Sequence, residues 1–172
     1  MSTGTLITVS SSDSAQDKRG HPPYSGRCLC GQIQFQLTQE PLTYYVCHCT
    51  VCQRRTGGAA LPVMWVLRES LVVTSGTPSL RVFNLGNGRE RRAQFCAACD
   101  TRLWAEPLDK PNIALLRPGM LDDQRSFRPI AHVFTRNRQP WFLLPHNVAQ
   151  FEAGPDSPDQ LIKLWQEHRP SE

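Results

Sequence analysis

The residues of this 172-residue chain whose types and spacing best fit chemistry are its seven cysteines, which fall into three short motifs. These are C-x-C-G (Cys28, Cys30), C-H-C-x-x-C (Cys47, Cys49, Cys52) and C-x-x-C (Cys96, Cys99). Short spacings direct two thiolates at one point, and two such pairs complete a tetrahedral zinc site. The motifs therefore predict metal binding.

The seven thiols divide naturally into four and three. The first and third motifs together supply four ligands, which predicts a closed structural zinc site if Gly31 bends the chain after Cys30. The middle motif supplies three ligands, and three protein ligands leave one tetrahedral position open, as in catalytic zinc sites. Two zinc ions per chain are expected. The alternative is one structural zinc with three spare thiols.

A disulfide framework is disfavoured by the odd number of cysteines. The first twenty residues lack the basic and long apolar regions of a secretory signal. A reducing, cytoplasmic location follows as an expectation, and no apolar run is long enough to predict a membrane helix.

Short strands are expected to position the cysteines. Strand-like runs occupy residues 32–37, 44–49, 61–67, 71–76, 80–86, 92–96, 101–106, 112–121 and 130–136. The first alternates strictly, so that Ile33, Phe35 and Leu37 share one face. Many short strands at this spacing indicate a mainly β domain, an antiparallel sandwich or barrel.

Helical signals are few. A short turn follows Cys52, and a helix is predicted within 157–168, with Ser157 as N-cap, Pro158 in the first turn and Gln160 completing a capping box. The expected organisation is a mobile tail over 1–22, a zinc-binding domain over 23–155 and a helical appendage over 156–172.

Three segments carry a family resemblance. GRCLCGQIQFQL, CHCTVCQRRTGG and QFCAACDTRLW resemble the cysteine blocks of the glutathione-dependent formaldehyde-activating enzyme (GFA) family, which includes centromere protein V. The resemblance covers roughly residues 24–155 and every cysteine. It implies an Mss4-like fold of stacked antiparallel sheets, and carbon–sulfur lyase activity that reversibly joins a thiol, glutathione in the name-giving case, to a small aldehyde such as formaldehyde.

The resemblance also implies roles for the cysteines. Cys28, Cys30, Cys96 and Cys99 would hold the structural zinc, and Cys47, Cys49 and Cys52 the catalytic zinc. Two positions depart from the family pattern. Asp100 stands where Gly is common, and Asp tolerates the left-handed conformation such a turn needs. The segment after PWF, with His146 and Asn147, replaces an acidic residue of many bacterial members.

Thiol chemistry suits three cysteine ligands on physical grounds too. A zinc with three thiolates carries a net charge of −1, which favours binding a soft substrate sulfur over activating water. Arg54 and Arg55 follow the third cysteine closely and are candidates to hold a substrate carboxylate, the alternative being solvated surface charges. Gly57 is a candidate for close substrate approach or a simple turn.

Other residues favour structural interpretations. His48 would face away from the flanking cysteines on a strand, and His132 has the pattern of a core histidine. His146, in a loop beside Pro145, is the better candidate for a polar role. The tryptophans Trp65, Trp104 and Trp141 are expected to pack in the core or at its rim.

Competing functions remain at this point. A zinc-ribbon nucleic-acid binder is suggested by the net charge of +4 and the RERR run at 89–92. Against it, fifteen acidic residues accompany nineteen basic ones, and the separation of Cys30 from Cys96 is too long for a compact ribbon. A non-catalytic Mss4-like scaffold that binds a protein partner would need only one zinc. Metal or thiol sensing is a third alternative.

Overall fold

The computed structural model describes residues 20–168 except 87 and 89, and it consists mainly of strands. The strands are β1 (Tyr24–Arg27), β2 (Gln34–Leu37), β3 (Thr43–Cys47), β4 (Leu61–Leu67), β5 (Leu71–Ser75), β6 (Ser79–Asn84), β7 (Glu90–Phe95), β8 (Arg102–Pro107), β9 (Ile113–Leu116), β10 (Ala131–Val133) and β11 (Ala149–Phe151). The α-helices are α1 (Thr50–Thr56) and α2 (Pro158–Glu167). Short 3₁₀ turns cover Arg68–Ser70, Pro118–Met120, Gln124–Ser126 and Thr135–Asn137.

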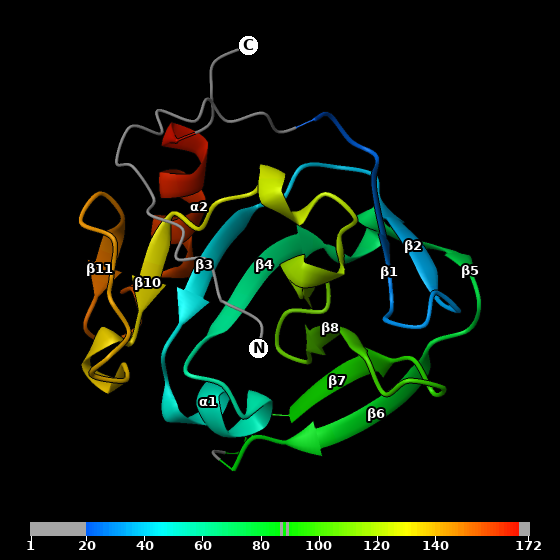
Figure 1. Cartoon of the computed structure of the whole chain (residues 1–172), viewed down its shortest axis with the longest axis horizontal. Coiled ribbons are helices and arrows are strands. Elements are labelled where there is room, and N and C mark those ends of the chain that lie inside the picture. Colours follow the sequence, from blue (N-terminus) through cyan, green and yellow to red (C-terminus); the bar gives the residue numbers. More distant parts are fainter. Residues whose placement is uncertain (1–19, 87, 89, 169–172) are drawn as a thin grey trace, which may run out of the picture.

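Two sheets form the body of the molecule (Figure 1). The smaller has the order β1-β2-β5, and the larger has the order β11-β10-β3-β4-β9-β8-β7-β6. The prediction of a mainly β fold with a short C-terminal helix is confirmed. The pairing is antiparallel as expected, except that β10 runs parallel to both β3 and β11. Parallel neighbours need a crossover connection, which the strand pattern alone does not reveal.

The main core contains the alternating face of the 32–37 segment. Ile33, Phe35 and Leu37 are buried as predicted. The Phe35 ring packs edge-on against Trp104 of β8, with ring centroids 5.8 Å apart. The main core cluster also includes Cys28 and Cys96, so the folding of the two sheets brings these cysteines to one place.

Helix α2 packs against the sheet through its buried residues Leu161 and Trp165. Ser157 is the N-cap as predicted, because its side chain accepts a hydrogen bond from the Asp159 amide. The predicted capping box differs in detail: the Gln160 side chain accepts from the amide of Asp156, not of Ser157. Thr43 of β3 donates to the Leu161 carbonyl at 2.9 Å, which joins helix and sheet.

Several boundaries differ from the predictions. The short strands β1 and β11 were not expected, and the predicted strand at 112–121 ends at Leu116, before the 3₁₀ turn that Pro118 begins. Most of the predicted tail over 1–22 lies outside the described residues. Within the described part of the chain, no helix is long and apolar enough to cross a membrane.

Candidate functional site

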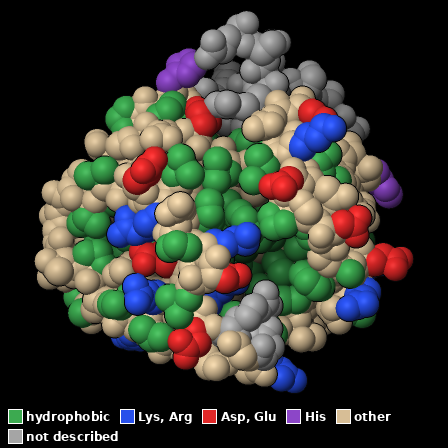
Figure 2. Space-filling model, turned by 180° about the vertical axis from the view of Figure 1, so that it is seen from behind, with side chains coloured by type: hydrophobic (Ala, Val, Ile, Leu, Met, Phe, Trp, Pro, Cys, Tyr) green, Lys and Arg blue, Asp and Glu red, His purple; other side chains and the backbone are tan. Residues whose placement is uncertain are grey.

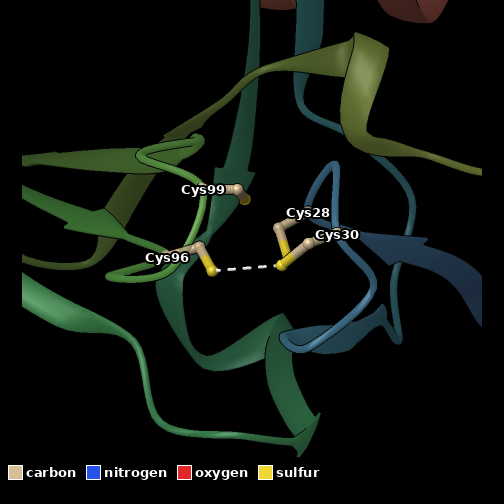
Figure 3. Close-up of side chains that lie close together, drawn as sticks. All are labelled: Cys28, Cys30, Cys96 and Cys99. Carbon is tan, nitrogen blue, oxygen red and sulfur yellow. Dashed lines mark hydrogen bonds between the residues drawn. The ribbon is translucent and has the colours of Figure 1, made fainter.

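Four cysteines from two distant parts of the chain meet between the sheets (Figure 3). Cys28 and Cys30 come from the turn after β1, and Cys96 and Cys99 from the turn between β7 and β8. The sulfur of Cys30 lies 3.5 Å from that of Cys28 and 3.7 Å from that of Cys96. All four sulfurs lie within 4.8 Å of one another. We call this group the four-cysteine cluster.

Each of the two turns that carry this cluster contains a residue in the left-handed backbone conformation. Gly31 has a φ of +76° and Asp100 a φ of +54°, so the bend expected at Gly31 and the conformation expected of Asp100 are both present. The amide of Ile33 points at the Cys28 sulfur, at 3.3 Å. An amide donor of this kind stabilises a thiolate, as the hydrogen bonds around metal-binding cysteines do.

The thiols of the four-cysteine cluster differ in acidity. The hydrogen bond with the Thr101 hydroxyl, at 3.1 Å, is the main cause that lowers the pKa of Cys99 to about 5. For Cys28, burial opposes ionisation, but hydrogen bonds, first that of the Ile33 amide, lower the pKa. The chain thus favours thiolates at two of the four positions before any metal is considered.

The other three cysteines come from one continuous segment. Cys47 is the last residue of β3, Cys49 is the N-cap of α1 and Cys52 lies in its first turn. The Cys49 sulfur accepts a hydrogen bond from the Cys52 amide at 3.4 Å. The three sulfurs lie within 4.8 Å of one another. Gly57, with a φ of +68°, ends the helix five residues later. We call this group the three-cysteine cluster.

One thiol of this group is strongly acidic because its neighbours donate to it. Hydrogen bonds from Cys47 and then Cys52 lower the pKa of Cys49 to about 2. Donation to Cys49 correspondingly raises the pKa of Cys47. Cys52 has mixed influences: its hydrogen bond with Cys47 lowers the pKa, while Cys49 and burial raise it to a net value of about 11. Such a group of crowded thiols is typical of a metal site.

Both clusters fit zinc. Zn–S bonds of about 2.3 Å in a tetrahedron separate the sulfurs by about 3.8 Å. The sulfur–sulfur distances of 3.5 and 3.7 Å in the four-cysteine cluster are close to this value. The four-cysteine cluster would fill every tetrahedral position, whereas the three-cysteine cluster would leave one open.

His48 and His132 form a buried pair behind the three-cysteine cluster. Nε2 of His48 lies 2.8 Å from Nδ1 of His132, and the Phe142 ring packs edge-on against His48. His48 is thus directed away from the cysteines, and His132 is a core residue, as predicted. Burial lowers the pKa of both imidazoles. Their contact was not foreseen, since it depends on the parallel pairing of β10 with β3.

The other predicted residues lie in varied positions. Arg54, Arg55 and Gly57 are exposed around α1, and the Arg55 guanidinium lies over the Phe83 ring, 3.9 Å from its centroid. His146 is exposed.

Of the tryptophans, Trp104 is buried and Trp65 half-buried, which agrees with core or rim packing. Trp141 is 70% exposed, which core packing does not explain, although its ring lies near that of Phe142. A surface groove between α2 and the β8–β9 loop includes Trp65 but none of the cysteines.

Two arginines beside the three-cysteine cluster were missed. Arg102 in β8 and Arg117 after β9 are partly buried, and each is close enough for the Cys52 charge to act on its pKa. Neither belongs to a motif, and both are distant from Cys52 in sequence. The alternation of β8 places Arg102 on one face, but only the fold shows which cysteine lies near it.

Comparisons with known proteins agree with the cysteine pattern. A family model described as glutathione-dependent formaldehyde-activating enzyme matches residues 23–137. A crystal structure of a Rhodobacter sphaeroides protein is 20% identical, with a TM-score of 0.46, over 58% of this chain and 88% of that one. At this level it supports no further argument. None of the curated proteins compared matches the chain.

Proposed function

This chain belongs to the glutathione-dependent formaldehyde-activating enzyme family, and on that premise we propose that it is a zinc-dependent carbon–sulfur lyase. It would reversibly add a thiol, with glutathione as the first candidate, to a small aldehyde. The observation that carries the proposal is the three-cysteine cluster, which offers three sulfur ligands and leaves a tetrahedral position for a substrate.

The chemistry follows from the ligands. When bound, zinc held by three thiolates supplies a soft Lewis acid that binds sulfur and lowers a thiol pKa from about 8.5. In the forward reaction, the thiol loses its proton, its sulfur bonds to the aldehyde carbon, and the carbonyl oxygen gains a proton. The reverse reaction breaks the same carbon–sulfur bond. No oxidant or reductant is needed.

The chain's own residues hold and orient the reacting groups. Cys47, Cys49 and Cys52 would be the catalytic zinc ligands, and the Cys52 amide keeps the Cys49 sulfur in place. Arg54 and Arg55 would bind a carboxylate of the thiol substrate, and both side chains are exposed. Gly57 has open space where a side chain would stand, so a substrate can approach its backbone.

The four-cysteine cluster has a different proposed role. Cys28, Cys30, Cys96 and Cys99 would hold a structural zinc that joins the smaller sheet to the larger one. All seven cysteines are free thiols, which is consistent with the reducing cytoplasm as the proposed location.

The test compares Cys52→Ser with Thr50→Ser, an exposed control in the same helix turn that changes no sulfur. We expect two zinc ions per wild-type chain and one in Cys52→Ser, measured by elemental analysis. Exchange between a thiol, formaldehyde and their adduct, followed by NMR, should fall at least about 100-fold in Cys52→Ser, since even indirect disturbance of a metal site costs 10–100-fold. Thr50→Ser should keep wild-type activity.

Full exchange activity with one zinc per chain would contradict the lyase mechanism. One zinc in the wild-type protein, without exchange activity, would instead favour the scaffold function.

A further inference from the structure

Three arginines from elements far apart in the sequence lie near Cys52, and two of them, Arg55 and Arg102, also lie over the aromatic ring of Phe83. Arg55 belongs to α1, Arg102 to β8, and Arg117 follows β9. The guanidinium carbons of Arg55 and Arg102 lie 3.9 and 5.3 Å from the Phe83 ring centroid. Stacking on an aromatic ring holds a guanidinium in a defined position while leaving its N–H edge available. We call these three residues the arginine cluster.

The arginine cluster has no acidic partner within the described part of the chain. None of its members forms an ion pair or a side-chain hydrogen bond there, and the buried Nε of Arg102 has no acceptor. The carboxylate of the same strand, Glu106, is occupied by Arg68 at 2.6 Å and by Trp104 at 3.0 Å. Buried donors are normally satisfied, so an unpaired guanidinium indicates a ligand that the chain does not provide.

The positive charges of the arginine cluster repel one another, and in addition to burial this repulsion lowers the pKa of Arg102. Burial, and then the charges of Arg55 and Arg117, lower the pKa of Arg102 to about 9. Burial also lowers the pKa of Arg55 and Arg117. Perturbed groups in a like-charged cluster are a feature of functional sites, where a ligand of opposite charge removes the repulsion.

The charges of the arginine cluster and of the neighbouring three-cysteine cluster indicate that a ligand bound between them carries more than one negative group. Three thiolates and one zinc carry −1 together, and three arginines carry +3, so about two positive charges remain uncompensated when the proposed zinc is present. A neutral aldehyde and a neutral thiol would leave this excess in place.

We propose that Arg55, Arg102 and Arg117 form an anion-binding subsite that selects thiol substrates by their negative charge, with carboxylate or phosphate oxygens as the recognised groups. This inference rests on the proposed function, because the thiol is taken to enter the open position beside Cys52. The subsite extends the contact predicted for Arg55 onto β8 and the end of β9. Arg102 lies in strand β8 and Arg117 directly follows strand β9, and these strands preorganise the subsite.

The charges on one face of the molecule favour a small anion over nucleic acid. Among the described residues drawn in Figure 2, Lys and Arg side chains are interspersed with Asp and Glu, and no continuous basic tract crosses that face. A duplex-binding surface would need many phosphate contacts along such a tract.

The experiment uses (methylthio)succinate, a dicarboxylate whose sulfur is blocked by a methyl group, so that binding does not require a free thiol. Titration calorimetry on the zinc-loaded full chain should detect its binding and little binding of its dimethyl ester. Arg102→Gln and Arg117→Gln should each raise the Kd at least about tenfold, as loss of a charge-assisted hydrogen bond does. Arg92→Gln, an exposed arginine of β7, is the matched control and should change the Kd less than twofold. Thermal unfolding checks that each variant is folded.

Two further arms identify the anion and separate this inference from the lyase proposal. Competition by inorganic phosphate against the dicarboxylate decides which oxygens are preferred. Equal binding of the probe to wild-type, Arg102→Gln and Arg117→Gln, equal binding of the ester, or tighter, steeply salt-dependent binding of a DNA duplex would overturn the subsite. Because the probe has no free thiol and no aldehyde is present, these results are independent of whether Cys52→Ser loses lyase activity. A subsite that binds the probe in a chain without lyase activity would reject only the proposed function.

Discussion

The four-cysteine and three-cysteine clusters bring together the same type of side chain in different settings. The first draws its sulfurs from two turns, Cys28 being separated from Cys99 by most of the smaller sheet and half of the larger one. The second is contained within six residues at the junction of β3 and α1. Of the residues around the second, Arg55, Arg102 and Arg117 have no acidic partner in the described part of the chain, whereas Asp100 beside the first is paired with Arg81 at 2.7 Å.

This difference suggests a structural role for the four-cysteine cluster and a catalytic role for the three-cysteine cluster. A metal that joins distant turns contributes its binding free energy to folding, because the unfolded chain does not bring those ligands together. A metal held by one short segment would constrain little of the chain. Three sulfur ligands would leave one metal position open, and the nearby arginines without acidic partners could bind a substrate that occupies it. The comparison therefore predicts opposite consequences for equivalent mutations in the two clusters.

The largest expected effect is on stability. Cys96→Ser replaces a fully buried cysteine of the four-cysteine cluster and should lower the free energy of unfolding by about 4 kcal/mol or more, enough to unfold many domains. Cys52→Ser, the matched change in the three-cysteine cluster, should cost only about 1 kcal/mol, because Cys52 is half-buried and its segment is local. Urea denaturation of the zinc-loaded proteins measures both. Equal losses would mean that the clusters do not differ in structural role.

The cysteine groups could be predicted from the sequence because the spacing of cysteines and the backbone conformation of a turn residue are local properties. The left-handed bend at Gly31 and the tolerance of Asp100 for such a bend follow from single residues, and both are present. The alternation of Phe35 and Leu37 likewise revealed the core face. That zinc occupies the two groups stays a prediction.

What sequence reasoning missed depends on long-range pairing. The contact of His48 with His132 follows from the parallel register of β3 and β10, which no local pattern encodes. The convergence of Arg102 and Arg117 on Cys52 requires the order of strands in the larger sheet. The RERR segment at 89–92 suggested nucleic-acid binding, but Arg55, Arg102 and Arg117, which have no acidic partner in the described part of the chain, lie outside that segment.

A smaller effect should appear at the arginine cluster. Arg102→Met keeps an apolar stem against Phe83 and removes a partly buried charge, so it should stabilise the ligand-free protein by about 1 kcal/mol. Such a gain is typical when a functional site is relieved of repulsion. Chemical denaturation at pH 7.5 checks the expected gain, and a loss of stability would show that Arg102 is a structural residue.

The pH dependence of this difference has a definite sign. The pKa of Arg102 is lowered to about 9 in the folded state, below its value in the unfolded chain. Its charge therefore destabilises the wild-type protein fully below pH 9 and progressively less as the pH rises above 9. The stability gap between Arg102→Met and wild type should be constant from pH 7 to 8 and narrow from pH 9 to 10.5. A gap that widens with pH would contradict the repulsion.

The most direct measurement of the difference between the clusters is ¹¹³Cd NMR of the cadmium-substituted protein, with and without a thiol. Two resonances are predicted, because four sulfur ligands and three create different environments at the metal. Adding thiol should shift only the resonance that is absent from Cys52→Ser, and leave the other unchanged. A single resonance, or two resonances that ignore the thiol, would contradict an open thiol-binding site at Cys47, Cys49 and Cys52.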